Sequence, residues 1–266
     1  MDSLRALINE ELSTLEQQLS YILKDSGGVF EDINVFINGQ SKRIRSVSTL
    51  LYLKANNITI DNNILNILLS GELIHNASLL HDDVIDESDI RRGEKSFFKK
   101  YNVKTAILSG DYILSIAVKK LLELNNTNII KIFTNATEKM SFAEILQYSK
   151  RGNNISKEEY ISIIEGKTAS LFEAIFESSA IISKIDTNKA KRFGNLFGVL
   201  FQINNDMLPE SIENDQKNNI ITIQNIIGIE KTNDLKDNYK EEMRSILYSL
   251  QINEYSKRLE ELINRL

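Results

Sequence analysis

The stretch from Gly71 to Gly93 reads GELIHNASLLHDDVIDESDIRRG and combines a helical apolar pattern with a dense group of acidic residues followed by two arginines. Its apolar residues recur at three- and four-residue spacing, which is typical of a helix. Asp82 and Asp86 lie four positions apart, so on a helix their carboxylates stand one above the other, with Asp83 beside them. Like charges at that spacing repel each other, and bridging hard divalent cations neutralise them well.

The residue types in this stretch indicate magnesium bound together with a diphosphate. Magnesium takes few carboxylates, several waters and phosphate oxygens, so paired aspartates suit an ion that arrives with its substrate. Arg91 and Arg92 follow and offer guanidinium forks for phosphate. The segment by itself leaves open a plainer interpretation, a solvated acidic helix end followed by a basic turn.

The composition of the chain favours an all-α fold in one domain. Of its 266 residues 42% are hydrophobic, while one proline and 11 glycines are too few for a turn-rich all-β chain. No linker divides it, so we expect a single domain over residues 1–266. Apolar spacing predicts about ten helices. We expect helix starts at Asp61 and at Ser156, where Glu159 completes a capping box, and a helix stop at Gly93.

Charge and cysteine content exclude several classes of function. A formal net charge of −5 without any basic run offers no face for nucleic-acid binding. The absence of cysteine excludes disulfides, thiolate metal sites and cysteine nucleophiles. Residues 1–16 form an acid-bearing amphipathic pattern rather than a secretion signal, and charged or amide residues interrupt each apolar stretch before it can span a membrane. These features predict a cytoplasmic protein.

Five segments resemble, in the same order along the chain, the motifs of the trans-type polyprenyl diphosphate synthases. The resemblance is to medium- and long-chain members of the family, such as the octaprenyl diphosphate synthases. The aspartate segment is similar to the family's DDxxD motif followed by RRG. GQSKRIRS at 39–46 resembles its basic GGKRxRP element, and FAEILQ at 142–147 resembles GEILQ. EGKTASLF at 165–172 resembles the lysine-threonine motif, and FGVLFQINNDML at 197–208 resembles the helix of the second aspartate-rich motif.

The resemblance implies an isoprenoid-synthase-type helical bundle around a central cavity, assembled as a homodimer. Its expected activity joins isopentenyl diphosphate to an allylic diphosphate with two or three magnesium ions. By position, the metal ligands are Asp82, Asp83, Asp86 and Asp206. The residues expected to bind the substrate diphosphates are Lys42, Arg45, His75, Arg91 and Arg92. The residues expected to line the reaction centre are Lys167, Thr168 and Gln202.

Plainer interpretations exist for some of these residues when the resemblance is set aside. His75 is then a core histidine bonded to backbone. Lys167 is then a solvated lysine, and Gln202 caps a buried backbone group.

Product length is expected to depend on the residues just before Asp82. Members of the family with short products carry bulky aromatics four or five positions before the first aspartate, whereas this chain has Ala77 and Ser78. Each helical turn rises about 5.4 Å, so a face without large side chains accommodates several isoprene units. We therefore expect a product longer than C15. Close helix packing is the plainer reason for small residues here.

The second aspartate-rich motif departs from the family pattern. It has Asn205 and Pro209 where aspartates are expected and keeps only Asp206. Asparagine brings no negative charge and proline brings no ligand, so a third metal site is expected to be weak. Pro209 is expected to end the helix near Leu208. The nearby carboxylates that could replace the missing ones are Glu210, Glu213 and Asp215.

Three other functions remain open at this point. The degraded second motif favours a noncatalytic or regulatory subunit of a heteromeric synthase. A class I terpene cyclase uses a similar aspartate motif, but it does not need the second diphosphate site that Lys42, Arg45, His75 and Arg92 supply. For a helical interaction protein, five ordered matches would be coincidence. Catalysis requires that acidic and basic clusters line one pocket, with Asp82 and Asp86 close to Lys42, Arg45 and Lys167.

Overall fold

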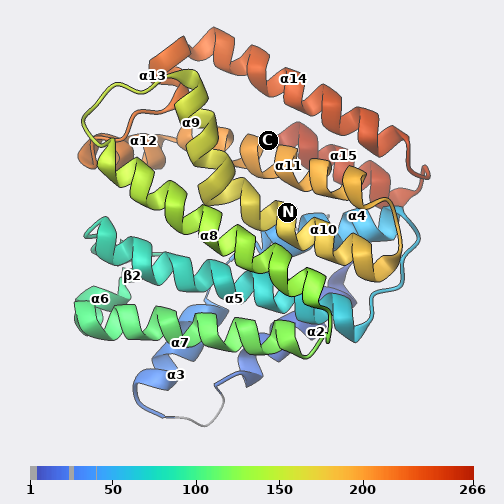
Figure 1. Ribbon diagram of the computed structural model, residues 1–266, viewed down its shortest axis with the longest axis horizontal. Coiled ribbons are helices and arrows are strands. Elements are labelled where there is room, and N and C mark those ends of the chain that lie inside the picture. The colour runs from blue at the N-terminus through green and yellow to red at the C-terminus, as the bar shows by residue number, and fades with distance from the viewer. Residues whose placement is uncertain (1–4, 24–26, 40) are drawn as a thin grey trace. The chain divides into compact units, whose positions relative to one another are not determined.

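The protein is described by a computed structural model, which places residues 5–23, 27–39 and 41–266 (Figure 1). Almost all regular structure in these residues is helical, which confirms the all-α prediction. The chain divides into two compact units, Met1–Leu50 with Thr59–Ile130 (unit 1) and Leu51–Ile58 with Lys131–Leu266 (unit 2). The single-domain interpretation stays a prediction, and each unit is described by itself.

Unit 1 is built around one long apolar helix. Its helices are α2 (Asn9–Tyr21), α3 (Val29–Asn38), the first part of α4 (Ile44–Ala55), α5 (Asn62–Ile85), α6 (Phe97–Lys100) and α7 (Val103–Leu122). Asp61 begins α5 as predicted, because its side chain accepts a hydrogen bond from the Ile64 backbone N–H. Most of α5 is buried all round its circumference, which is typical of a central helix. It lies beside α7, as Figure 1 shows, and also packs against α2.

The prediction of a helix stop at Gly93 is wrong, because α5 ends at Ile85 and a small hairpin follows. Strand β1 (Ile90–Arg91) pairs antiparallel with β2 (Glu94–Lys95). The two loop residues, Arg92 and Gly93, both have positive φ, at 55° and 83°. A two-residue hairpin loop of type I′ has positive φ at both positions, which glycine adopts without strain. The hairpin turns Arg91 back to Asp83 near the end of α5, while Arg92 reaches the Phe36 carbonyl and, at 3.4 Å, Asn76 of α5.

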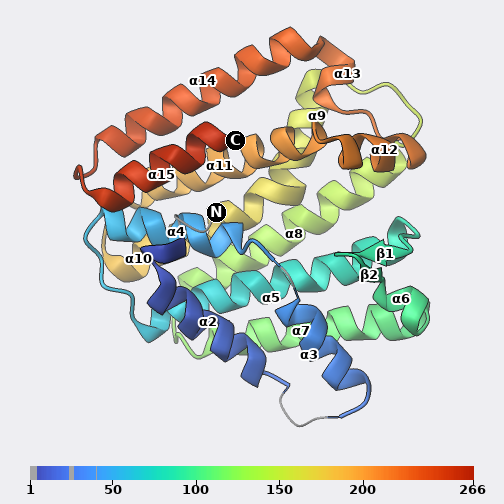
Figure 2. The same cartoon turned by 180° about the vertical axis from the view of Figure 1, so that it is seen from behind.

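Unit 2 contains the remaining helices around an aromatic core. They are the end of α4, most of α8 (Thr127–Ser149), α9 (Lys157–Ile164), a π-helical turn η1 (Glu165–Ala169), α10 (Ser170–Ser183), α11 (Thr187–Asp206), α12 (Pro209–Lys217), α13 (Ile223–Ile227), α14 (Ile229–Tyr248) and α15 (Glu254–Arg265). The core rings of Tyr52, Phe172, Phe176, Phe193 and Phe197 contact one another with centroids 5.0–6.5 Å apart. Figure 2 shows α15 running beside α14.

Two sequence features fix the helix boundaries in unit 2. Ser156 and Glu159 form the predicted capping box at the start of α9. Helix α11 ends at Asp206 and Pro209 opens α12 at its first position, close to the predicted break. Short helices such as α6 and α13 raise the number of α-helices in the described residues to fourteen, above the predicted ten or so. In residues 5–23, 27–39 and 41–266, no helix has the length and apolarity needed to cross a membrane.

Candidate functional site

The last turn of α5 presents an acidic pair, Asp82 and Asp86. The backbone N–H of Asp86 donates to the carbonyl of Asp82 at 2.8 Å, so the two residues are one helical turn apart as predicted. Asp86 is the C-cap residue of α5, and both aspartates are half-buried. The end of α5 therefore carries two carboxylates at a spacing where they are expected to repel each other.

Asp83 occupies a different environment from the acidic pair. Its side chain is buried, and Oδ1 accepts hydrogen bonds from Nε of Arg91, at 2.7 Å, and from the terminal NH2 of the same guanidinium. Burial raises the pKa of Asp83, and the bonds from Arg91 oppose that rise. Asp83 thus anchors the hairpin to α5 through Arg91, and its assignment as a metal ligand stays a prediction.

A basic cluster surrounds His75, two turns before the acidic pair on α5. Burial lowers the pKa of His75 well below its usual value, and the charges of Arg45, Arg92, Arg91 and Arg43 lower it further. The imidazole is therefore neutral at pH 7 and can both donate and accept a hydrogen bond. Four guanidinium groups that act on one neutral ring create a strongly positive potential, which suits a polyanion.

The predicted cations of unit 1 differ in how firmly they are held. Lys42 is exposed, whereas Arg45 is 8% exposed, and burial lowers its pKa to about 10. Arg92 donates to the carbonyl of Phe36 at 3.0 Å, and its guanidinium lies 5.5 Å from the centre of the Phe36 ring. The structure thus brings Lys42, Arg45, His75, Arg91 and Arg92 into one unit with the acidic pair. Their diphosphate-binding roles stay predictions.

Sequence reasoning missed the ion pair that holds this basic cluster in place. Arg43 NH1 lies 3.2 Å from Glu72 Oε2, and the two side chains are 3% and 2% exposed. The other oxygen of Glu72 accepts from the Ser46 hydroxyl at 2.6 Å, and Arg43 NH2 donates to the Ile37 carbonyl at 2.8 Å. These contacts fix the start of α4 against α5. The signal in the sequence was a glutamate inside an otherwise apolar helix.

The donor set at the end of α5 fits magnesium. Among the residues that the structure describes, no three Asp, Glu, His or Cys side chains gather into a complete metal cage. Magnesium does not need one, because it binds through one or two carboxylates plus substrate phosphates and keeps several waters. Asp82 and Asp86, half-buried and without a histidine or cysteine ligand, offer that kind of partial site.

In unit 2 the lysine-threonine motif lies in the π-helical turn η1, between α9 and α10. Single π turns inside helices occur frequently at functional sites, because the extra residue redirects the side chains. Lys167 Nζ lies 2.6 Å from Glu144 Oε2 and donates to Gln147 Oε1 at 2.8 Å. Both partners belong to the FAEILQ stretch on α8, which explains why the two motifs occur together.

The other predicted reaction-centre residues form a continuous hydrogen-bond chain, the Asp206 network. The hydroxyl of Thr168 donates to Gln202 Oε1 at 2.7 Å, and Gln202 Nε2 donates to Asp206 Oδ1 at 2.6 Å. Tyr160 donates its hydroxyl to Asp206 Oδ2 at 2.5 Å. Burial raises the pKa of Asp206 to about 6, while Tyr160, Gln202 and the charge of Lys167 oppose that rise. Sequence reasoning missed Tyr160.

The donor set of the second motif does not fit a magnesium site. Both oxygens of Asp206 accept hydrogen bonds from protein groups, and the residue is 7% exposed. Asn205 brings no charge, Pro209 brings no ligand, and Glu210 and Glu213 are exposed on α12. Asp215 is close enough for its charge to act on Tyr160. A buried carboxylate that already serves two donors is a poor metal ligand, and the assignment of Asp206 to a metal stays a prediction.

The two expected chain-length residues lie on different faces of α5. Ala77 lies seven residues after Ser70 and four before His81 on the helix, so the three share one side. Ser70 and His81 both contact α7 backbone carbonyls, at 3.3 Å each, so this side faces α7. Ser78 is half-buried and lies on the side of Asp82. A role in product length stays a prediction for both residues, and Ser78 has the better placement.

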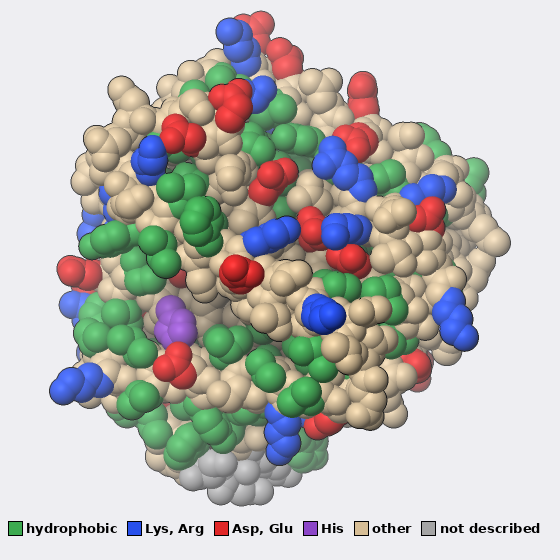
Figure 3. Space-filling model, in the orientation of Figure 1, with side chains coloured by type: hydrophobic (Ala, Val, Ile, Leu, Met, Phe, Trp, Pro, Cys, Tyr) green, Lys and Arg blue, Asp and Glu red, His purple; other side chains and the backbone are tan. Residues whose placement is uncertain are grey.

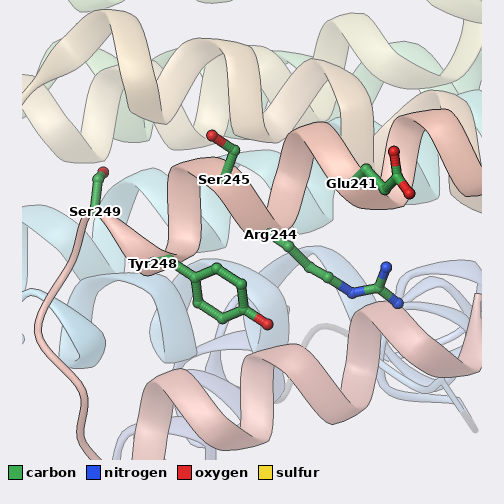
Figure 4. A pocket seen from close by; sticks show the side chains of 5 residues that line it. All are labelled: Glu241, Arg244, Ser245, Tyr248 and Ser249. Carbon is green, nitrogen blue, oxygen red and sulfur yellow. The ribbon is translucent and has the colours of Figure 1, made fainter.

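A surface groove of about 570 Å³ runs along α14 and is lined by Glu241, Arg244, Ser245, Tyr248 and Ser249 (Figure 4). Its lining includes none of the residues that the motifs single out. Arg244 donates to Asn264 and Tyr248 donates to Glu260, so the polar groups of this groove bind α15. The groove therefore adds nothing to the candidate site.

Comparison with known proteins gives consistent matches. The family model described as polyprenyl synthetase matches residues 29–247. The octaprenyl diphosphate synthase of Escherichia coli (strain K12) is 30% identical over 224 residues, which is 81% of this chain. The geranyl-diphosphate-specific all-trans-nonaprenyl-diphosphate synthase of Rhodobacter capsulatus is 36% identical over 147 residues, 54% of this chain. The aligned stretches span 65% and 45% of these two relatives, less than two thirds of each.

A solved structure shares the fold. The crystal structure of a decaprenyl diphosphate synthase from Rhodobacter capsulatus superposes with a TM-score of 0.90 at 21% sequence identity. The match covers 99% of this chain and 97% of that one. An isoprenoid-synthase-type helical bundle is thereby confirmed as the fold.

Proposed function

This chain belongs to the polyprenyl synthetase family, and we propose that it condenses isopentenyl diphosphate with an allylic diphosphate to give a trans-polyprenyl diphosphate longer than C15. The observation that carries the proposal is the arrangement on α5. There the neutral His75 lies among four arginines, two turns before the half-buried pair Asp82 and Asp86. One helix thus offers a site for a polyanion and a partial site for a hard cation.

The basic cluster holds the diphosphate of isopentenyl diphosphate. Lys42, Arg45, His75 and Arg92 supply charge and hydrogen-bond donors, and Arg43 keeps the start of α4 in position. A neutral His75 can donate to a phosphate oxygen without adding a further charge to the four arginines. The substrate is therefore held by its phosphate end, which leaves its double bond free to react.

Asp82 and Asp86 would hold magnesium together with the diphosphate of the allylic substrate. When bound, magnesium neutralises the negative charge that develops on the departing diphosphate. In the proposed reaction the allylic C–O bond breaks and a C–C bond forms to the isopentenyl double bond, after which a proton leaves. Arg91, oriented by Asp83, adds a guanidinium for the same diphosphate.

The side chains of η1 and α11 act on the reacting carbon chain. Lys167, held by Glu144 and Gln147, supplies the positive charge of the lysine-threonine motif. The Thr168 hydroxyl donates to the Gln202 carbonyl oxygen and keeps its own lone pairs for developing positive charge, and hydrogen bonds hold both side chains, so neither is free to capture the cation. Two magnesium ions at the acidic pair suffice for this proposal, and no third site is invoked at Asp206.

A second copy of the chain is the partner we propose. Helix α7 exposes large apolar side chains along its length, and Figure 3 shows hydrophobic side chains gathered over it. The exposed residues are Val103, Ile107, Leu108, Tyr112, Val118 and Leu122. A face of this kind favours burial in a homodimer. Replacing Leu108 by glutamate is expected to yield monomers in light scattering, whereas a wild-type chain that is already monomeric contradicts the dimer. The predicted cytoplasmic location stays a prediction.

The test of this function is product analysis. Purified protein is incubated with isopentenyl diphosphate, magnesium and geranyl or farnesyl diphosphate, and the products are resolved by chain length. Asp82→Asn is expected to lower the rate on the order of a hundredfold, because it weakens the site for the magnesium that would neutralise the departing diphosphate. The matched control is Asp234→Asn, which removes an exposed charge on α14.

One observation favours a second candidate function. The second motif has lost two of its carboxylates, and the remaining one serves as a hydrogen-bond acceptor, as expected of a noncatalytic or regulatory subunit. Elongation only after addition of a partner synthase would support that function. Elongation by the purified chain alone would exclude it.

A further inference from the structure

The Asp206 network contains a carboxylate that the motif comparison assigned to metal binding but that serves the protein itself. Tyr160 lies in an apolar cluster with Ile164, Ala169, Val199, Ile203 and Ile223. A phenol hydroxyl in such surroundings needs an acceptor, and Asp206 Oδ2 provides it at 2.5 Å. The backbone carbonyl of Asp206 accepts from Gln224 Nε2 at 2.9 Å, which also fixes the end of α11.

The direction of the hydrogen bonds in this network is determined by Asp206. An ionised carboxylate only accepts, so both neighbours must present donors to it. Gln202 therefore turns its NH2 toward Asp206 and its carbonyl oxygen toward Thr168. The Thr168 hydroxyl must then donate to that oxygen, which leaves the lone pairs of its own oxygen facing elsewhere. One buried charge thus decides how two reaction-centre side chains are oriented.

We propose that Asp206, supported by Tyr160, is a positioning residue that fixes the amide of Gln202 and the hydroxyl of Thr168, and that it does not bind metal. The inference rests on the proposed function for its catalytic consequence alone. Asparagine replaces Asp206 only in part, because its NH2 faces either Tyr160, whose hydroxyl then loses its buried acceptor, or Gln202, which must then turn its carbonyl oxygen toward position 206. A flipped Gln202 would then offer NH2 to Thr168 and reverse the polarity of both groups.

Two near-isosteric variants test the role, Asp206→Asn and Tyr160→Phe. Both are expected to lower kcat between about tenfold and a hundredfold, because the reaction-centre groups lose their orientation, while KM changes by less than about threefold. The matched control is Tyr239→Phe, which removes a hydroxyl next to the same apolar cluster without touching Asp206. Its kcat is expected to equal that of the wild type.

A direct metal measurement separates positioning from ligation. Manganese is titrated into each variant with inorganic diphosphate, and the bound ion is counted by electron paramagnetic resonance. We expect wild type, Asp206→Asn and Tyr160→Phe to bind the same number of ions. Loss of an ion in Asp206→Asn but not in Tyr160→Phe would overturn the proposal, as would a wild-type kcat in Tyr160→Phe.

A double-mutant cycle on Asp206 and Tyr160 tests their interaction by stability, without any measurement of catalysis. Urea unfolding of both single variants and of the double variant is expected to show coupling, because the two residues share one hydrogen bond. Additive effects would overturn the network. A wild-type chain that elongates no substrate would refute the proposed function, while manganese binding and coupled unfolding would still decide the role of Asp206.

Discussion

Replacing Glu72 by glutamine removes one charge from a buried ion pair and leaves the shape of the side chain almost unchanged. In the wild type Arg43 NH1 lies 3.2 Å from Glu72 Oε2, with the two side chains 3% and 2% exposed. The Arg43 charge would remain buried with its carbonyl contact to Ile37 but without a counter-charge. Removing one partner of a buried pair typically costs about 3–5 kcal/mol, a large part of the stability of an ordinary domain.

Urea and thermal unfolding measure this loss. The melting temperature of Glu72→Gln is expected to fall by roughly 6–20 °C, since about 1 kcal/mol corresponds to about 2–4 °C in a chain of this size. The matched control is Glu16→Gln, which breaks the Arg5–Glu16 pair at 2.6 Å with side chains 30% and 42% exposed. Its cost is expected to stay below about 1 kcal/mol, because exposed pairs contribute little.

A loss in Glu72→Gln no larger than that in Glu16→Gln would refute the reasoning about burial. The combined variant Arg43→Met with Glu72→Leu provides a further check. Apolar side chains of similar size carry no desolvated charge, so the double variant is expected to lose less stability than Glu72→Gln alone.

Three other perturbations test separate parts of the structure. Because the pKa of His75 is lowered in the folded protein, the unfolded chain binds a proton below pH 6.5 that the folded chain does not bind. The free energy of unfolding therefore falls as the pH drops. Urea unfolding of wild type should show this group as a slope of up to about 1.4 kcal/mol per pH unit on the acid side, and an unchanged slope in His75→Gln would contradict it. Ser78→Phe is expected to shorten the product, as measured by chromatography, whereas Ala77→Phe should chiefly lower the melting temperature. Unchanged products from Ser78→Phe would refute the hypothesis that the small side chain at this position allows a long product. A Cβ added at Gly198 would lie 2.5 Å from the Ala169 Cα, so Gly198→Ala is expected to cost about 1–3 kcal/mol in urea unfolding, and a wild-type midpoint would show that η1 can move.

The local structure of α5 could be predicted because it depends on neighbours in sequence. Helical spacing places Asp82 and Asp86 one turn apart whatever surrounds them, and the Asp61 cap requires only the N–H three residues later. The capping box of Ser156 and Glu159 was predictable for the same reason.

The partners of these residues could not be predicted, because they come from distant parts of the chain or depend on backbone conformation. Positive φ at Arg92 and Gly93 makes a hairpin of a segment whose glycine suggested a helix stop, and that turn brings Arg91 to Asp83. Asp206 is a comparable case. Its motif suggested a metal, whereas packing buries it beside Tyr160, 46 residues earlier in the chain.

The sequence by itself determined the helical class, the family motifs and the spacing of charges along each helix, since these follow from short-range periodicity and residue type. Only the tertiary structure decided which charges are compensated. Arg43 is matched by Glu72, Arg91 by Asp83 and Lys167 by Glu144. Pairing of this kind depends on distances across packed helices, because a buried charge is stable only when the fold places a group of opposite charge within a few ångströms of it.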